Sequence, residues 1–340
     1  MAQRSLLGKV RLAARGARSY LGNRPFIVSY EVTLSCTCNC HHCDLGGVLK
    51  DEKQVGPEEY AEITRRLKPL VAQISGGEPL LRTDLPAIVR AIKQGGGVPH
   101  AIVVTNGVLL DEKNYLELRE AGVDQFSISL DFPDERHDEF RRRPGLYRRL
   151  EQKLPQLASF GFKDIVLNTA ITKANMSEIL PLAEKAAEWN VAISYSAYTP
   201  LRTNDAGYSI STERNLDSLR GAIRELLIRK KEGANIGNPD VALRGIVSFF
   251  EQGYMPNCKA GGRFLIVMPD GSLVPCSLHR TKFASRQDMK RDFSRTNRCG
   301  GCYVAIRSYS ELPLLWHLKS SGMYLRQTAF RRETVVPARP

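Results

Sequence analysis

Short apolar runs and longer amphipathic stretches alternate along this chain from residue 26 to residue 196. The apolar runs predict strands at 26–34, 70–75, 99–104, 124–130, 164–170 and 191–196. The stretches between them predict helices at 57–68, 85–93, 112–121 and 176–189, with a basic helical stretch that ends near residue 160. Strands that alternate with helices form a parallel sheet covered by helices. Six such units, rather than the eight of a closed barrel, predict an α/β fold of the partial (β/α)6 barrel type.

Eight cysteines form two tight groups with more than 200 residues between them. Disulfides are the weaker interpretation, because no secretory segment precedes the cysteines. A chain of 340 residues with 42% apolar residues can also bury a core without covalent links. Tight groups of cysteines are typical of metal or cluster sites. The groups are Cys36, Cys38, Cys40 and Cys43, and then Cys258, Cys276, Cys299 and Cys302.

The first group follows the first predicted strand, which puts it at the C-terminal rim where such barrels carry their chemistry. Cys36, Cys40 and Cys43 can hold three corners of an iron–sulfur cube, leaving one iron open to a ligand. The alternative is a zinc ion held by four of the ligands between residues 36 and 43, which include His41 and His42. On this segment alone both remain open.

The Cys-x3-Cys-x2-Cys spacing after the first strand resembles the radical S-adenosylmethionine (SAM) superfamily. Further motifs follow the next strands in order, and together they extend the resemblance over about residues 26–197. They are Gly76-Gly77-Glu78-Pro79, Thr105-Asn106-Gly107, Ser127-Ile128-Ser129-Leu130-Asp131 and His137-Asp138-Glu139-Phe140-Arg141. The resemblance implies a [4Fe–4S] cluster on Cys36, Cys40 and Cys43 and reductive cleavage of SAM to a 5′-deoxyadenosyl radical.

The resemblance also implies a set of SAM contacts. Backbone carbonyls of the segment Gly76 to Pro79 and the Glu78 carboxylate would accept from the methionine amino group, because glycines allow close backbone approach. Ser129 and Arg141 would meet the ribose or the carboxylate, since an Arg fork suits a carboxylate. Two further residues are assigned to the SAM site, Asn106 after the third strand and Asn168 near the ribose hydroxyls.

Two residues of the cluster loop depart from the family pattern. His42 stands where the family usually has an aromatic residue near the adenine, and an imidazole can still stack there. Cys38 is an additional thiol at a position that the family pattern skips. We expect Cys38 to be a small buried residue, with alternative ligation or redox sensitivity as the other interpretations.

The second cysteine group resembles the C-terminal auxiliary-cluster module called SPASM in its long form and Twitch in its short form. Its four cysteines would ligate one auxiliary [4Fe–4S] cluster, namely Cys258, Cys276, Cys299 and Cys302. A structural zinc on the same four thiolates is the alternative. Between the first two of them, Asp270-Gly271 separates two short apolar runs and predicts a hairpin.

The remaining segments complete the predicted organisation. The ranges are a basic leader at 1–24, the barrel at 25–212, linking helices at 213–256, the auxiliary module at 257–305, and a helix near 308–319 with a basic tail to residue 340. The leader has six Lys or Arg and no acid. It could lie on an anionic membrane as an amphipathic helix, act as a transit peptide, or pack loosely on the domain. No run is long enough to span a bilayer, and we expect a cytoplasmic protein, peripheral to a membrane at most.

Three functions fit these features. The first is hydrogen abstraction from a small anionic or amphiphilic intermediate, such as a lipid, tetrapyrrole or sugar derivative. The net charge of +13 favours anionic partners, and Tyr195, Tyr198 and Arg202 could line the substrate cavity. The second is maturation of a ribosomally made peptide, although the cluster loop starts too early for the recognition domain of many such enzymes.

The third function is metal-stabilised RNA binding through the basic run from Arg141 to Arg149, which contains Tyr147. The intact cluster and glycine motifs argue against it, and we do not expect a nucleic-acid partner. A radical SAM enzyme would also need an electron donor such as flavodoxin or ferredoxin.

Overall fold

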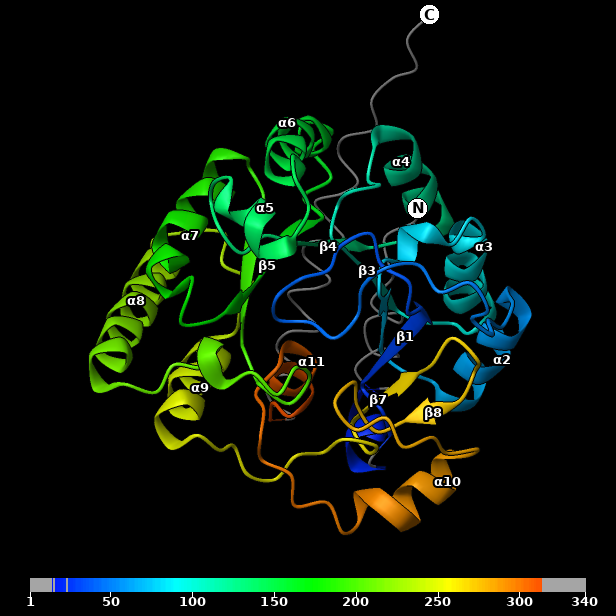
Figure 1. The fold of residues 1–340 in the computed structure, drawn as a ribbon. Coiled ribbons are helices and arrows are strands. Elements are labelled where there is room, and N and C mark those ends of the chain that lie inside the picture. The colour runs from blue at the N-terminus through cyan, green and yellow to red at the C-terminus, as the bar shows by residue number, and fades with distance from the viewer. Residues whose placement is uncertain (1–13, 15, 23, 314–340) are drawn as a thin grey trace, which may run out of the picture.

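A computed structural model describes residues 14, 16–22 and 24–313. Its centre is one eight-stranded sheet in the order β6-β5-β4-β3-β2-β1-β7-β8 (Figure 1). Strands β1 to β6 pair in parallel in sequence order, which confirms the predicted partial α/β barrel. They are β1 (Ile27–Thr33), β2 (Val71–Gly76), β3 (His100–Thr105), β4 (Gln125–Ser129), β5 (Ile165–Ile171) and β6 (Ala192–Ala197).

Helices surround the outer side of this sheet (Figure 1). The main ones are α2 (Pro57–Leu67), α3 (Leu85–Arg90), α4 (Glu112–Ala121), α6 (Leu146–Ala158), α7 (Ile179–Glu188), α8 (Glu213–Lys231) and α9 (Asp240–Gln252). Shorter elements are η1 (Pro79–Leu81), η2 (Ala91–Gly95), α5 (Arg136–Arg141), η3 (Met176–Glu178), η4 (Ala206–Tyr208), α10 (Arg286–Met289), η5 (Lys290–Ser294) and α11 (Ala305–Ser310).

Local sequence explains where these helices begin and end. Helix α2 starts with Pro57, whose missing N–H is harmless in a first turn. Helix α4 starts at a capping box in which the Asp111 side chain accepts from the backbone N–H of Asn114. It ends at Gly122, whose φ of +117° suits a residue without Cβ.

The strands present apolar side chains to the helices and polar ones to the interior. The Tyr30 hydroxyl lies 2.7 Å from Thr64 Oγ1 of α2, and the Tyr195 hydroxyl donates to the Ile179 carbonyl of α7 at 2.7 Å. Because neighbouring side chains of a strand point to opposite faces, the residues between such positions face inward. The inward side chains include Ser29, Glu31, Gln73, Ser75, Ser127, Ser129, Asn168, Ser194 and Ser196. The interior of this barrel therefore carries many polar side chains beside apolar ones such as Ile102 and Val166.

The C-terminal region continues the barrel sheet. Strand β7 (Phe264–Val267) pairs in parallel with β1, and β8 (Leu273–Val274) pairs antiparallel with β7. The turn between them contains Gly271 at φ +80°, so the predicted hairpin is confirmed. Helix α11 contacts both β6 and β7 and so lies across the gap between the two sides of the open barrel (Figure 1).

The last predicted helix differs from the structure. Sequence periodicity places it near 308–319, whereas α11 covers Ala305–Ser310. The helix begins earlier because its buried residues, Arg307 among them, pack against the auxiliary segment. The part of the prediction after residue 313, and the basic tail, lie outside the described residues.

The free edge of β6 is covered by an extended segment at residues 235–238. Asn238 donates from Nδ2 to the Tyr195 carbonyl at 2.8 Å and accepts from the Tyr195 N–H at 2.7 Å. A side chain that both donates to and accepts from the strand backbone replaces the hydrogen-bond partner that an edge strand lacks. This clamp joins the end of the barrel to α9.

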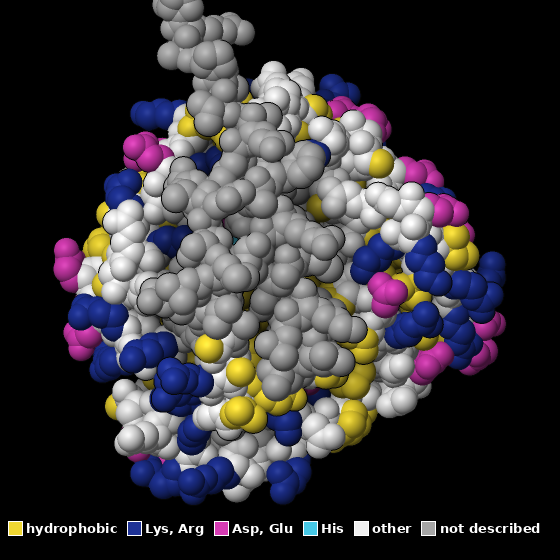
Figure 2. Space-filling view, turned by 180° about the vertical axis from the view of Figure 1, so that it is seen from behind, with side chains coloured by type: hydrophobic (Ala, Val, Ile, Leu, Met, Phe, Trp, Pro, Cys, Tyr) yellow, Lys and Arg dark blue, Asp and Glu magenta, His cyan; other side chains and the backbone are white. Residues whose placement is uncertain are grey.

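Most of the basic leader, which was proposed as an amphipathic helix, lies outside the described residues. Its described end packs on the domain: the Tyr20 ring lies 6.0 Å from that of Phe26 and 3.9 Å from the Arg263 guanidinium. Within the described ranges, none of the helices combines the length and apolar character that crossing a bilayer requires. Figure 2 shows Lys and Arg spread round the rim of one face, so charge marks no single docking patch there.

Candidate active site

The three cysteines proposed to hold the first cluster lie in the loop that follows β1. The loop is pinned by two backbone bonds, from Cys36 N–H to the Gly47 carbonyl at 2.8 Å and from Cys43 N–H to the Cys40 carbonyl at 3.2 Å. Cys40 is buried, while Cys36 and Cys43 are partly exposed. The loop thus offers three thiols at the C-terminal rim of the sheet.

Cys38 is buried, as predicted, and its thiol lies between the sulfurs of Cys36 and Cys40. Its hydrogen bonds lower the pKa of Cys36 to about 6 and that of Cys40 to about 7. The same contacts raise the pKa of Cys38. A proton kept on Cys38 leaves the two flanking sulfurs as the stronger ligands.

The donor set fits a cluster better than a single ion. Among the described residues, no three Cys, His, Asp or Glu side chains converge on one metal position. A structural zinc requires four such ligands round one ion. Three thiols in one short loop suit a cube that keeps one iron open.

Glycines 76 and 77 bring the β2 turn against the cluster loop. A Cβ at Gly76, whose φ is +135°, would lie 2.0 Å from the Thr33 carbonyl oxygen, and one at Gly77 would lie 2.1 Å from that of Ser35. We predicted that these glycines allow a ligand to approach the backbone closely. In the structure, the backbone of Thr33 and Ser35 makes this close approach. It packs this turn against the start of the cluster loop, where Gly77 N–H also donates to the Thr33 carbonyl at 2.7 Å.

Glu78 has a different environment from the one predicted. Its carboxylate is fully buried and accepts from Thr105 Oγ1 and Asn106 N, both at 2.8 Å, and from Leu80 N at 3.1 Å. Burial raises its pKa to about 7. Because both oxygens have partners inside the protein, Glu78 joins the turn after β2 to the end of β3. The backbone carbonyls of the turn stay the other acceptors proposed for a SAM amino group.

Asn106 connects that junction to the cluster loop. Its Nδ2 donates to Thr37 Oγ1 at 2.9 Å and lies 3.7 Å from the Cys36 sulfur. Its Oδ1 accepts from Val108 N at 2.9 Å. With all its groups engaged, Asn106 supports the loop that carries Cys36.

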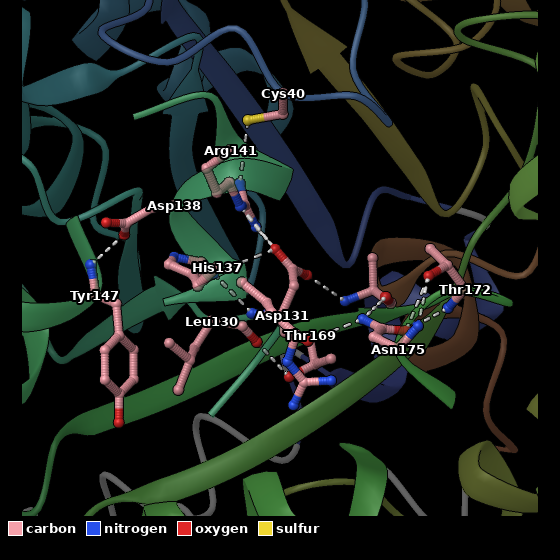
Figure 3. A network of polar contacts seen from close by, with 12 residues as sticks. Cys40, Leu130, Asp131, His137, Asp138, Arg141, Tyr147, Thr169, Thr172 and Asn175 are labelled. Carbon is pink, nitrogen blue, oxygen red and sulfur yellow. Dashed lines mark hydrogen bonds and ion pairs between the residues drawn. The ribbon is translucent and has the colours of Figure 1, made fainter. Parts of the chain in front are cut away.

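Arg141, predicted to meet the SAM ribose or carboxylate, is engaged inside the protein. The side chain is buried and donates from Nε to Asp131 Oδ2 at 2.7 Å, with Nη2 2.5 Å from the same oxygen. Its Nη1 lies 3.7 Å from the Cys40 sulfur (Figure 3). The guanidinium is therefore engaged by Asp131 and the cluster loop.

A network that sequence reasoning missed holds Asp131 in place (Figure 3). Its N–H donates to His137 Nδ1 at 3.2 Å, and its carbonyl accepts from Asn175 Nδ2 at 3.1 Å. His137 is fully buried, and burial lowers its pKa to about 3. Asp131 stood in a quoted motif, but nothing in the sequence marked Asn175.

His42 stacks on Phe140, with ring centroids 4.8 Å apart and planes 9° from parallel. Burial lowers its pKa to about 4, so the ring is neutral. The Phe140 stack fixes one face of the imidazole beside the cluster loop. This geometry is compatible with the aromatic role proposed for position 42.

Ser129 and Asn168 are register partners on the inner face of neighbouring strands. Both are partly exposed, and neither side chain has a hydrogen bond to another part of the described chain. Ser194 is the next register partner, on β6. These three side chains form a polar row that can meet hydroxyl groups of a ligand.

The four cysteines of the second group line one enclosed pocket, although among the described residues no three of them lie close enough to hold a single metal ion. Cys258 after α9, Cys276 after β8, and Cys299 and Cys302 before α11 line it together with apolar side chains such as Phe264. Burial raises the pKa of Cys258 to about 11 and that of Cys276 to about 12. Four thiols in a dry pocket suit a metal centre, because a bound metal stabilises the thiolate that burial disfavours.

A fully buried arginine that the sequence did not reveal stabilises this pocket. Arg307 donates from Nη1 to the Cys302 carbonyl at 2.6 Å, and from Nη2 to the carbonyls of Met255 and Pro256 at 2.6 and 2.8 Å. Its Nε reaches Glu311 at 3.1 Å. One side chain thereby ties the segments before the first and after the last auxiliary cysteine.

The basic run from Arg141 to Arg149 does not form the surface expected of an RNA-binding protein. Arg141 is buried against Asp131, and the Tyr147 ring packs 6.2 Å from Trp189 with only 4% exposure. Stacking on bases needs exposed rings, so the geometry does not support this alternative.

The three residues predicted to line a substrate cavity after β6 point in different directions. Tyr195 points outward to α7, and the Tyr198 hydroxyl donates to the Asp205 carbonyl within its own loop at 2.7 Å. Arg202 instead reaches the cluster loop, where its Nε donates to Asp44 at 2.7 Å. Of the three, Arg202 faces the rim.

Comparison with known proteins gives the same family. The family model of the Radical SAM superfamily matches residues 30–186. An AdoMet-dependent heme synthase of Methanosarcina barkeri is 31% identical over 279 residues, 75% of this chain and 77% of the relative. A GTP 3′,8-cyclase of Rhodopirellula baltica is 26% identical over 286 residues, 79% of each protein.

A likeness in fold extends beyond the barrel. The crystal structure of Streptococcus suis SuiB bound to S-adenosylmethionine superposes with a TM-score of 0.60 at 20% identity, covering 80% of this chain and 66% of SuiB. Enzymes of this kind use SAM and a [4Fe–4S] cluster, which is the chemistry that the cysteine loop suits. The chain belongs to the radical SAM superfamily.

Proposed function

We propose that this enzyme takes a hydrogen atom from a small anionic biosynthetic intermediate, with a carboxylated tetrapyrrole as the first candidate. The observation that carries the proposal is the polar inner face of the barrel, which begins directly below the cluster loop. Two relatives named AdoMet-dependent heme synthase support the candidate class, each 31% identical where it matches. An intermediate rich in carboxylates also suits a chain with net charge +13.

In this proposal Cys36, Cys40 and Cys43 hold the first cluster. When bound, the reduced cluster supplies the electron that breaks SAM into methionine and a 5′-deoxyadenosyl radical. The carbonyls of Gly76 and Gly77 accept from the SAM amino group. Pro79 fixes the turn that presents them, since it occupies the first position of η1.

Three further side chains would complete the SAM site from the inner face and the rim. His42 offers its ring to the adenine, and Ser129 and Asn168 offer hydroxyl and amide groups to the ribose. Glu78, Asn106 and Arg141 act as positioning residues, because their polar groups are engaged by the turn, the loop and Asp131.

The auxiliary pocket would hold a second [4Fe–4S] cluster on its four cysteines. Full thiolate ligation leaves no open iron, so this centre would not bind the substrate directly. In the proposal it would accept one electron from the substrate radical, which would lose a proton to solvent, so that the substrate would lose two electrons overall. An electron donor such as flavodoxin or ferredoxin reduces the first cluster.

Anaerobic reconstitution with iron and sulfide tests this proposal. We expect about eight iron ions per chain, four for each cube, and 5′-deoxyadenosine formation that rises when a carboxylated porphyrin is added. GTP and an unstructured peptide serve as comparison substrates, since the likeness to SuiB is one of fold alone. Stimulation by the peptide and not by the porphyrin would replace our candidate with the peptide-maturase alternative.

A further inference from the structure

Four charged residues from distant segments meet beside the cluster loop. Asp44 directly follows Cys43 and pairs through Oδ1 with Arg202 Nε at 2.7 Å and through Oδ2 with Arg280 Nη1 at 3.2 Å. Arg202 comes from the loop after β6, and Arg280 comes from the auxiliary module, four residues after Cys276. Glu31 faces this group from the inner side of β1.

Three polar atoms of this group are buried without a hydrogen-bond partner in the described part of the chain. They are Nη2 of Arg202, Nη2 of Arg280 and Oε2 of Glu31. Glu31 is 5% exposed, so water does not readily satisfy it. Buried polar groups in native proteins almost always have partners, and leaving a charged one unmet costs several kcal/mol. Such a set of unmet atoms marks a place for a ligand.

The unmet atoms are of opposite character and do not satisfy one another. No ion pair within 4.0 Å joins Glu31 to either arginine among the described residues. Asp44 uses one carboxylate to orient two guanidinium groups, and each still has its Nη2 free. Two such donors on guanidinium groups that share one carboxylate partner could bind the two oxygens of a carboxylate or phosphate. An acceptor at Glu31 matches an adjacent N–H or O–H.

We propose that Arg202, Arg280 and Glu31 form the substrate-specificity site, binding an anionic group of the substrate with a hydrogen-bond donor beside it. The anionic group is a carboxylate or a phosphate, held by the two free Nη2 atoms, and Glu31 accepts from the donor. The inference rests on the proposed function, whose substrate class it makes more specific.

The position of this site suggests that a bound anion would also connect separate parts of the protein. Its residues come from the cluster loop, the end of the barrel and the auxiliary module, and the anion would join all three. Because Asp44 adjoins Cys43, a substrate held here lies next to the first cluster. A bound anion would thus fix the auxiliary module over the barrel and orient the substrate towards the radical source.

Binding to the reconstituted holoenzyme tests the site. The probes are a tetracarboxylic porphyrin, GTP and inorganic pyrophosphate, and the measurement is the dissociation constant under anaerobic conditions. We expect R202Q and R280Q to weaken the probe that binds by about 10- to 100-fold each, as for a lost charge-assisted hydrogen bond. E31Q should weaken the porphyrin or GTP, whose N–H groups can donate to the Glu31 carboxylate.

Arg66→Gln is the matched control, because that arginine is exposed on the outer helix α2. Iron content and thermal unfolding report folding, and R280K, which keeps the charge, should retain part of the affinity if R280Q folds poorly. Loss of porphyrin binding assigns a carboxylate site, and loss of GTP and pyrophosphate binding assigns a phosphate site.

Two results would overturn the inference: no probe binds the native holoenzyme, or R202Q and R280Q bind every probe as tightly as the native protein does. A different result would contradict the proposed function while leaving this site intact. A porphyrin that binds through these arginines without stimulating 5′-deoxyadenosine formation would exclude the substrate candidate and keep the site.

Discussion

Arg141 and Asp131 form a buried ion pair beneath the cluster loop, with Nη2 and Oδ2 2.5 Å apart. The pair comes from α5 and the end of β4, and the same guanidinium also faces the sulfur of Cys40. An ion pair removed from water is stable only when both partners are present. The loop that carries the cluster ligands is thus held by an interaction that tolerates no single truncation.

The first prediction concerns this pair. Arg141→Gln leaves Asp131 charged and buried, and we expect a loss of about 3–5 kcal/mol in the free energy of unfolding. The first cluster should be lost with it, which iron analysis after reconstitution would detect. Arg143→Gln is the control, because that residue lies in the same basic run and is exposed. An R141Q protein with full iron content would contradict the role given to the pair.

A second prediction separates Cys38 from its neighbours. Cys40→Ala should abolish 5′-deoxyadenosine formation and remove about four iron ions per chain, the content of one cube. Cys38→Ala should keep both, because its thiol acts only as a donor to the flanking sulfurs. Equal losses in the two variants would make Cys38 a ligand.

The third prediction tests the glycine turn. In Gly77→Ala the new methyl group would meet the backbone of Ser35, which cannot move without shifting the cluster loop. We expect a loss of about 1–3 kcal/mol in stability together with weaker SAM binding, measured by titration of the holoenzyme. Gly221→Ala in α8 has open space around it and should instead stabilise the protein by about 0.5–1 kcal/mol. If both variants behaved alike, the tight packing at Gly77 would be irrelevant to SAM binding.

A fourth prediction concerns the auxiliary pocket. Arg307→Met leaves three backbone carbonyls and Glu311 without their buried donor, and we expect a loss of about 3–5 kcal/mol in stability. About four of the iron ions should be lost, again one cube, while substrate-free SAM cleavage continues at the first cluster. Arg298→Met, exposed in the same segment, is the control. Retention of the auxiliary iron in R307M would show that the four cysteines hold the cluster without help from Arg307.

The redox role of the auxiliary centre gives the fifth prediction. In the double variant C276A/C299A, SAM cleavage should persist and product formation should fall. The two are measured together as 5′-deoxyadenosine and oxidised product. If product formation were undiminished, the auxiliary centre would have a structural role only.

The sequence by itself determined the fold and the chemistry of the rim. Apolar runs with a period of two and amphipathic stretches are local signals, so the six β/α units and the Asp270-Gly271 hairpin could be predicted. The cysteine spacing and the Gly76-Gly77 pair are equally local, whereas SAM chemistry was implied by the family resemblance of several such motifs taken together.

Only the tertiary structure decided which polar groups remain free. Arg141 and Glu78 were expected to contact SAM, yet partners remote in sequence, Asp131 and Asn106, engage them. Arg280 carries no local signal at all, and it becomes informative because the auxiliary module brings it to Asp44. A side chain's availability for a ligand depends on every group that folding places around it, and that is a property of contacts between segments rather than of sequence position.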